Sequence, residues 1–160
     1  MIIVTTGTML PFDRLVQAMD RWAEQHSSEE VFAQIGDGAY EPQHMKWSRF
    51  LGPGEFAERV RMSSLIVAHA GTGSFFLAAE TGKAVVMLPR LAANREHTTD
   101  HQVHTAKWLS SKQGVYVAMT EDQLPAAIAK ARAAGSLAAS QSTPFAPKPF
   151  LAEIRKFLLA

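Results

Sequence analysis

The sequence predicts an α/β fold, a Rossmann-like parallel sheet flanked by helices. Short apolar runs recur without polar alternation, as expected of strands that are buried on both faces; they include residues 2–5, 65–68 and 84–88. Helical periodicity separates these runs, beginning with an apolar stripe in residues 11–25. Because strand, helix and strand follow one another repeatedly, right-handed parallel units are expected.

Composition narrows the class of protein. The 160 residues, 17.5 kDa, fit one domain, predicted over residues 1–160. With 16 basic and 15 acidic residues the net charge is +1, so no nucleic-acid partner is expected. The absence of cysteine excludes disulfides and thiolate metal sites. The N-terminal MIIVTTGTML lacks the basic flank of a signal peptide, and no apolar run approaches the roughly 20 residues of a membrane span. These features predict a cytoplasmic chain.

The first half of the chain alternates strands and helices. The predicted elements are a strand at residues 2–5, a helix over 11–25, a strand at 31–35, a short edge strand at 47–51 and a helix over 55–63. Pro11 suits an early position in its helix. Glycine-containing turns at Gly36 and Gly52 mark ends of elements.

The second half continues the alternation. Strands are predicted at residues 65–68, 84–88 and 115–118, with a short helix after the first, a helix over 99–109 after the second, and a helix from Thr120 to about Ala133. Residues 134–149 are rich in Ala, Ser and Pro and predict a connecting loop. The final helix, residues 150–159, is amphipathic, and it either packs on its own sheet or docks a partner or a membrane surface.

A glycine-rich turn, His69-Ala70-Gly71-Thr72-Gly73-Ser74, follows the strand at 65–68 and opens a helix. Thr72 or Ser74 is expected to cap this helix, whose free amides suit a phosphate. Phe76 stands where a dinucleotide-binding turn needs a small residue, and Gly82-Lys83-Ala84 lies too late for a P-loop. The diphosphate of a nucleotide sugar and a plain strand-to-helix turn remain as interpretations.

A polar loop follows the strand at 84–88. It carries Arg90, Glu96, Asp100, His101 and Gln102 beyond the carboxyl end of that strand, where ligands of α/β sheets bind. Sugar hydroxyls need such donors and acceptors, and either His101 or Glu96 is a candidate for acid–base catalysis. The spacing of His97, His101 and His104 fits a metal site weakly, because His97 is expected to lie outside the helix. No metal is therefore predicted.

These motifs together resemble the C-terminal, donor-binding domain of family 28 glycosyltransferases. The similar segments are Val4-Thr5-Thr6-Gly7-Thr8, Gln34-Ile35-Gly36, the glycine turn from His69 to Ser74, Gly82-Lys83-Ala84, Pro89-Arg90, Glu96-His97 and Asp100-His101-Gln102. The resemblance covers roughly residues 2–110. In size and pattern the chain is most similar to small single-domain subunits of two-part glycosyltransferases, such as the catalytic subunit of the eukaryotic dolichol-linked N-acetylglucosamine transferase and bacterial exopolysaccharide counterparts.

The resemblance implies the C-terminal half of a GT-B glycosyltransferase that binds a nucleotide sugar, usually UDP-linked, and inverts the anomeric carbon without a metal or other cofactor. It places the diphosphate on Gly71, Thr72, Gly73 and Ser74 and the sugar on His101 and Gln102. Gly7 and Thr8 line the cleft, with His69, Arg90 and Asp100 also in the donor site. The resemblance places residues 53–56 near the nucleobase of the nucleotide sugar.

One position departs from the family pattern. Where the family has a ribose-binding carboxylate, this chain has Leu77, and Glu80 lies one helical turn further on as a candidate substitute. The resemblance also implies a membrane-associated acceptor-binding subunit, which would hold the chain at the inner face of the membrane; the isolated chain could form a homo-oligomer. Because of Leu77, a non-catalytic accessory subunit is the alternative to a catalytic donor-binding subunit.

Overall fold

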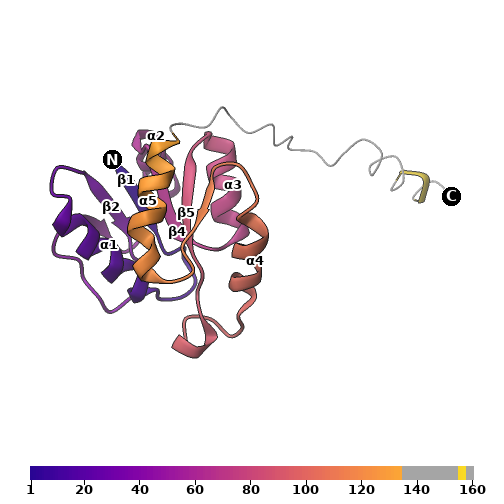
Figure 1. The fold of residues 1–160 in the computed structure, drawn as a ribbon, viewed down its shortest axis with the longest axis horizontal. Coiled ribbons are helices and arrows are strands. Elements are labelled where there is room, and N and C mark those ends of the chain that lie inside the picture. Colours follow the sequence, from indigo (N-terminus) through magenta and orange to yellow (C-terminus); the bar gives the residue numbers. More distant parts are fainter. Residues whose placement is uncertain (135–154, 158–160) are drawn as a thin grey trace.

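The computed structural model describes residues 1–134 and 155–157 (Figure 1). It contains a six-stranded parallel sheet with the strand order β3-β2-β1-β4-β5-β6. Thr5 pairs in register with Gln34 of one neighbouring strand and with Ala68 of the other. The strands are β1 (Ile2–Thr5), β2 (Val31–Gln34), β3 (Lys46–Ser48), β4 (Leu65–His69), β5 (Ala84–Leu88) and β6 (Val115–Val117).

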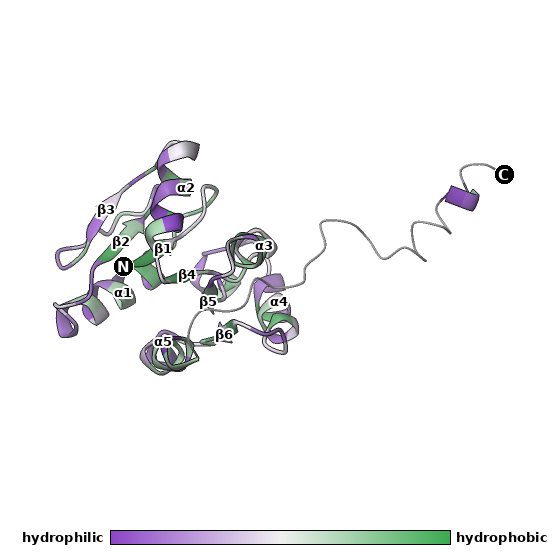
Figure 2. Ribbon diagram, turned by 90° about the horizontal axis from the view of Figure 1, so that it is seen from above, coloured by the Kyte–Doolittle hydropathy of each residue, from purple (hydrophilic) through white to green (hydrophobic). Residues whose placement is uncertain are grey.

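Helices cover both faces of this sheet, which confirms the predicted Rossmann-like architecture. They are α1 (Asp13–Gln25), α2 (Pro53–Met62), α3 (Thr72–Thr81), α4 (His101–Leu109) and α5 (Leu124–Ala133), with short 3₁₀ turns η1 (Ala92–Asn94) and η2 (Glu121–Gln123). Viewed from above, α1 and α5 lie on one face, and α2, α3 and α4 lie on the other (Figure 2).

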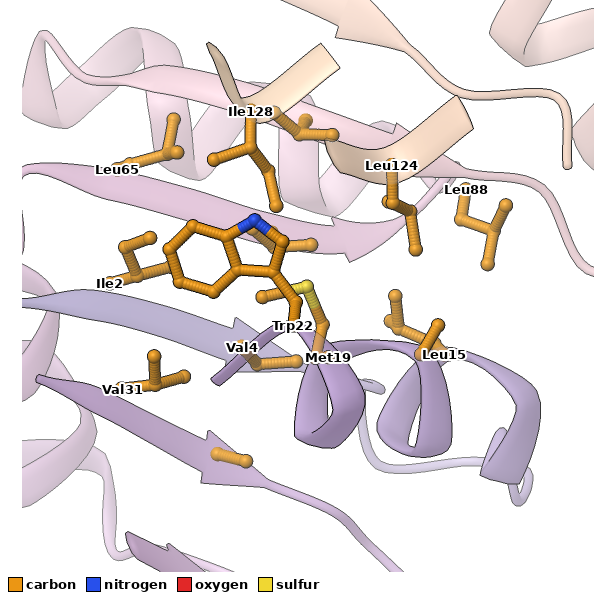
Figure 3. Packing of buried hydrophobic residues seen from close by; sticks show 14 of the residues in the cluster. Ile2, Val4, Leu15, Met19, Trp22, Val31, Leu65, Leu88, Leu124 and Ile128 are labelled. Atoms are coloured by element: carbon orange, nitrogen blue, oxygen red, sulfur yellow. The ribbon is translucent and has the colours of Figure 1, made fainter. Parts of the chain in front are cut away.

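Two apolar clusters hold these layers together because successive strand residues face opposite sides. On the α1 side, Trp22 and Met19 pack with alternate strand residues such as Val4 and with Leu124 and Ile128 of α5 (Figure 3). On the opposite side, strand residues such as Ile3 and Ile66 pack against α2, α3 and α4. Burial of this kind is the main favourable contribution to folding.

The predicted boundaries shift by a few residues for local reasons. Helix α1 begins at Asp13 rather than Pro11, after the buried N-cap residue Phe12. Helix α2 begins earlier than predicted because Pro53 occupies its first turn, and η2 precedes α5, whose first turn likewise contains proline.

Two further expectations concern helix ends. The predicted capping of α3 by Thr72 or Ser74 is wrong: Gly71 is the N-cap residue, and no side chain caps the helix. The loop predicted at 134–149 and the helix predicted at 150–159 lie outside the described residues except for Ala134 and residues 155–157; the latter are helical, and Phe157 is 84% exposed.

Candidate functional site

The candidate site lies where the sheet changes direction. Strand β1 sits between β2 and β4, so the chain proceeds from β1 toward one edge of the sheet and later from β4 toward the other. At such a switch point the loops after the two strands diverge and leave a crevice at their carboxyl ends. Here the loops are residues 6–12 after β1 and residues 70–71 before α3.

The larger cavity at this crevice has a volume of about 430 Å³. One wall is apolar and is formed by Leu51, Pro53, Phe56 and Leu77. The remaining lining carries hydroxyl, amide, imidazole and backbone groups and comes from Thr5, Gly7, Thr8, Gln34, His69, Gly73 and Ser74. Among the residues that the structure describes, no aspartate, glutamate, lysine or arginine lines this cavity.

A smaller cavity of about 140 Å³ shares Gly7, Thr8 and His69 with the larger one. Its other lining residues are Thr6, Met9, Leu10, Arg90, His97 and Gln102. The smaller cavity therefore presents polar side chains, whereas the larger one presents an apolar wall, and the two meet at His69.

The imidazole of His69 is held against two glycines. A Cβ atom at Gly7 would lie 2.9 Å from its Cε1 atom, and one at Gly71 would lie 2.5 Å from its Nε2 atom. Gly7 also has a φ of +77°, which a residue with a side chain rarely adopts. Burial, assisted by the positive charge of Arg90, lowers the pKa of His69 to about 4, so its ring is neutral at pH 7. Its buried Nδ1 atom has no partner among the described residues.

Several residues that line the two cavities, or adjoin their lining, have unbonded backbone amides. Along residues 1–134, the N–H groups of Thr8, Met9 and Leu10 donate no intramolecular hydrogen bond, and neither do those of Thr72 and Gly73. The last two begin α3, where the helix dipole adds partial positive charge. Two groups of free donors thus flank the rim that the two cavities share.

Arg90 does not extend into the site as a free cation, although the sequence placed it there as a donor contact. It is 3% exposed, and its guanidinium lies 4.5 Å from the ring centroid of Phe12. It donates to the carbonyl oxygens of Thr6 at 2.7 Å and Leu10 at 2.6 Å, and also to that of Pro11. Burial lowers its pKa to about 10, which still leaves it charged at pH 7.

The carboxylate of Glu96, which the sequence offers as a candidate general base, is already hydrogen-bonded within the protein. Oε1 and Oε2 accept from Arg14 at 2.8 Å and 2.9 Å, and Oε2 also accepts from the amide of Leu91. Arg14 reaches Glu121 as well, at 2.9 Å. Burial disfavours the charge on Arg14, but its hydrogen bonds to Glu96 and Glu121 outweigh that effect and raise its pKa.

The Asp100-His101-Gln102 segment divides between structural and exposed positions. Gln102 is buried, lines the smaller cavity, and accepts a hydrogen bond from the backbone amide of Arg90 through Oε1. Asp100 is exposed and accepts from the amide of Ala92, and the exposed His101 bonds Thr99; neither residue lines the larger or the smaller of these two cavities. The structure therefore does not place Asp100 and His101 with the other predicted contacts.

His97 lines the smaller cavity, although the sequence assigns it no individual role beyond a weak metal-ligand spacing. Its Nδ1 atom accepts the amide of Thr98 at 2.9 Å, which leaves Nε2–H as the donor of the neutral ring. The only signal in the sequence is its place in the polar loop, which does not distinguish it from His101.

Leu77 and Glu80 occupy different surroundings on α3. Leu77 lines the larger cavity, whereas Glu80 is exposed and is not part of either cavity. Glu80 therefore lies apart from the residues that line the two cavities, and its suggested role as a ribose-binding carboxylate stays a prediction.

Clusters of potential metal ligands and membrane-spanning helices are both absent from the described part of the chain. No group of three or more His, Cys, Asp or Glu side chains there has a geometry that could hold a metal ion. Among the same residues, no helix combines the length and the apolar character required to cross a membrane.

Comparisons with known proteins identify similar glycosyltransferases. The model of the glycosyltransferase family 28 C-terminal domain matches residues 1–153. No curated protein matches the chain. Two similar solved structures are a glycotransferase of kitacinnamycin, with a TM-score of 0.61 and 15% identity, and the spinosyn forosaminyltransferase SpnP, with a TM-score of 0.56 and 19% identity. The matches cover 98% and 99% of this chain but only 37% and 44% of those two chains.

Proposed function

The chain belongs to the glycosyltransferase family 28 C-terminal domain family, and from this membership we propose that it binds the nucleotide-sugar donor, a UDP-sugar, of an inverting glycosyltransferase. The observation that carries the proposal is the pair of free-amide groups on either side of His69. Amides of Thr8, Met9 and Leu10 belong to one group, and those of Thr72 and Gly73 belong to the other. Unbonded amides at a loop and a helix N-terminus favour a diphosphate.

The two cavities suit the two ends of such a donor. A volume of about 430 Å³ lies in the range of small-molecule sites, and its apolar wall suits the faces of a nucleobase. The cavity of about 140 Å³ offers Gln102 and His97 to the hydroxyl groups of a monosaccharide. The diphosphate would lie between them, beside the shared residues Gly7, Thr8 and His69.

The proposed role of the chain in transfer is to hold the leaving group. The acceptor hydroxyl oxygen attacks the anomeric carbon while the bond from that carbon to the diphosphate oxygen breaks. Negative charge develops on the diphosphate, where the free amides and the N-terminus of α3 stabilise it. The hydroxyl proton passes to a general base on the acceptor-binding partner, since Glu96 is bonded to Arg14.

A partner is part of the proposal. The chain spans less than half the length of the two solved glycosyltransferases described above, and its switch-point crevice opens beside the exposed Met9, 87% accessible. We infer that a membrane-associated acceptor-binding subunit supplies the second wall of the cleft and holds the chain at the inner face of the membrane. The product would be a polysaccharide or a lipid-linked glycan.

An accessory, non-catalytic role is the second candidate. Leu77 favours it, because the apolar wall offers no carboxylate to a ribose. An accessory chain would stabilise its partner without binding a donor.

Two matched variants test donor binding. Gly73 and Gly54 are each the second residue of a helix, α3 and α2 respectively, and a Cβ atom at either position meets nothing within 4 Å. Aspartate at both positions should leave the fold intact, since acidic residues suit helix N-termini. Calorimetric titration with UDP should show binding by the wild type and by Gly54→Asp, and at least a tenfold loss in Gly73→Asp.

The outcomes separate the candidate functions. Equal affinity in all three proteins would place the diphosphate elsewhere. Absence of binding of UDP, UDP-sugars, GDP and thymidine diphosphate by the wild type would refute the donor site and favour the accessory role, and thermal shifts with the same ligands give an independent measurement.

A further inference from the structure

The segment that carries the free amides of Thr8, Met9 and Leu10 has almost no support of its own. Thr6 bonds the carbonyl oxygen of Gln34, and the Gly7 amide bonds the Thr5 hydroxyl. Within the described residues, however, the amides of Thr8, Met9 and Leu10 donate to no other backbone group, and Pro11 has no N–H to donate. A loop with so few internal bonds is expected to be mobile unless another part of the molecule holds it.

Arg90 supplies that support from beyond β5. Its guanidinium donates to the carbonyl of Thr6 on one side of the three free amides and to those of Leu10 and Pro11 on the other. The same guanidinium lies over Phe12, which is fully buried. One planar side chain therefore fixes both ends of the amide-bearing segment.

The position of Arg90 is itself fixed from the other side. Its backbone amide donates to Gln102 Oε1 at 3.1 Å, and its Nη1 atom also donates to the carbonyl of Glu96 at 3.3 Å. The carboxylate of Glu96 bonds Arg14, which in turn bonds the carbonyl of Pro89 at 2.8 Å. Arg90 thus lies within a network that joins α1, the end of β5 and the start of α4.

The donors of Arg90 are nearly all committed to this network. Nη1 makes two hydrogen bonds and Nη2 makes two, so only Nε–H has no acceptor in the described part of the chain. A bidentate contact with a phosphate would require Arg90 to release the loop. The hydrogen bonds of Arg90 therefore position the loop and leave no pair of donors for the phosphate itself.

We propose that Arg90 is a positioning residue for the diphosphate, an inference that rests on the proposed donor function. By holding the carbonyls of Thr6, Leu10 and Pro11 on its own side, it keeps the amides of Thr8, Met9 and Leu10 available to an anion. If the segment rotated, carbonyl oxygens would face the diphosphate and repel it. The planar fork of arginine fits several carbonyls at once, which lysine cannot reproduce.

Arg90→Lys tests this role, and Arg49→Lys is its matched control. Arg49 also bonds loop carbonyls, those of Gly36 and Gly38, but that loop lines neither cavity. In titrations with inorganic pyrophosphate and with UDP, Arg90→Lys should lose at least tenfold in affinity and Arg49→Lys less than twofold.

A second measurement distinguishes positioning from direct contact. Without ligand, amide order parameters at Thr8, Met9 and Leu10 should fall in Arg90→Lys from about 0.85 to below about 0.6, the range of flexible backbone. Unchanged order parameters with weakened binding would show direct contact, and unchanged binding would also overturn the proposal.

The two proposals fail in different ways. If the wild type binds neither probe, the donor function fails, whereas the order parameters still decide whether Arg90 fixes the loop. Should Arg90→Lys not fold, Phe12→Leu replaces it: this change removes the ring under the guanidinium and keeps the charge. The same loss of order and of affinity is then expected.

Discussion

The two loops that meet at the switch point are held in different ways. The turn between β4 and α3 is held by neighbouring residues: the amide of Gly71 bonds the carbonyl of His69, and the amides of Ser74 and Phe75 bond that of Gly71. The loop between β1 and α1 is held by Arg90, about eighty positions away in the sequence. One half of the candidate diphosphate site is therefore local, and the other depends on tertiary structure.

This difference predicts where the site is sensitive to mutation. Changes within the β4–α3 turn should act directly on the ligand and on His69. The β1–α1 loop should instead be sensitive to substitutions far from it, at the charged residues that position Arg90. His69 lies against both loops and should respond to either.

The largest loss of UDP affinity is expected from Gly71→Ala, which alters the β4–α3 turn. The new Cβ atom would lie 2.5 Å from Nε2 of His69, so the ring or the turn must move. We expect the affinity for UDP to fall about a thousandfold, which corresponds to about 4 kcal/mol. Calorimetry with Gly73→Ala as the control checks this, because a Cβ atom at Gly73 meets nothing within 4 Å. Equal affinities of the two variants would show that the position of His69 does not matter.

The next largest effect concerns the contacts that support the β1–α1 loop from distant parts of the sequence. Glu96→Gln removes a charge whose side chain is 9% exposed and leaves Arg14 with only Glu121. Arg14 keeps Glu121 as a carboxylate partner but loses a charged acceptor inside the protein, so the free energy of unfolding should fall by about 2 kcal/mol. Urea denaturation measures this.

The exposed pair of Glu55 and Arg59 provides the control for that measurement. Glu55→Gln should cost only about 0.3–0.5 kcal/mol. If both substitutions had the same small effect, the Arg14–Glu96 pair would not support the loop.

The same distinction between local and remote support explains what could be predicted from the sequence. Strands and most helices were predictable because buried runs and apolar stripes are local patterns, and the glycine turn was recognised for the same reason. The edge strand was predicted at residues 47–51, whereas β3 spans Lys46–Ser48, and the first helix was predicted to begin two residues early, since boundaries depend on packing.

The side chains of the polar loop were harder to assign. Glu96 and Arg90 carry the residue types of a ligand site, but burial and pairing with distant Arg14 and residues 6–11 give them structural contacts instead. His97 and His101 are four positions apart, and only the turn of the chain before α4 determines that His97 lines a cavity. No pattern within one segment contains that information.

His69 offers a pH-dependent test of how the two loops meet. Its pKa in the folded chain is about 4, below the ordinary 6.5, so the unfolded chain takes up the proton first as the pH falls. Stability from the neutral ring is present above pH 6.5 and should be lost between pH 6.5 and about 4, by about 2 kcal/mol after allowance for partial exposure.

Comparison with His69→Asn isolates this contribution, because other groups titrate in both proteins alike. The difference in unfolding free energy between wild type and variant should shrink as the pH falls through this window. A difference that stays constant from pH 7 to pH 4 would mean that burial does not lower the pKa of His69.

The smallest effect concerns the apolar wall beyond the two loops. Leu77 lines the larger cavity and Glu80 does not, so a carboxylate placed at residue 77 would reach a ribose there, whereas the native carboxylate at residue 80 would not. Leu77→Glu should therefore raise the ratio of the affinity for UDP to the affinity for deoxy-UDP, which lacks a ribose hydroxyl group, about tenfold. This change corresponds to about 1.4 kcal/mol of binding free energy. Glu80→Ala should change UDP affinity less than twofold, and Leu77→Gln separates the effect of charge from that of shape. Marked weakening by Glu80→Ala in the same calorimetric titration would instead place the ribose beside Glu80 and require α3 to turn on binding.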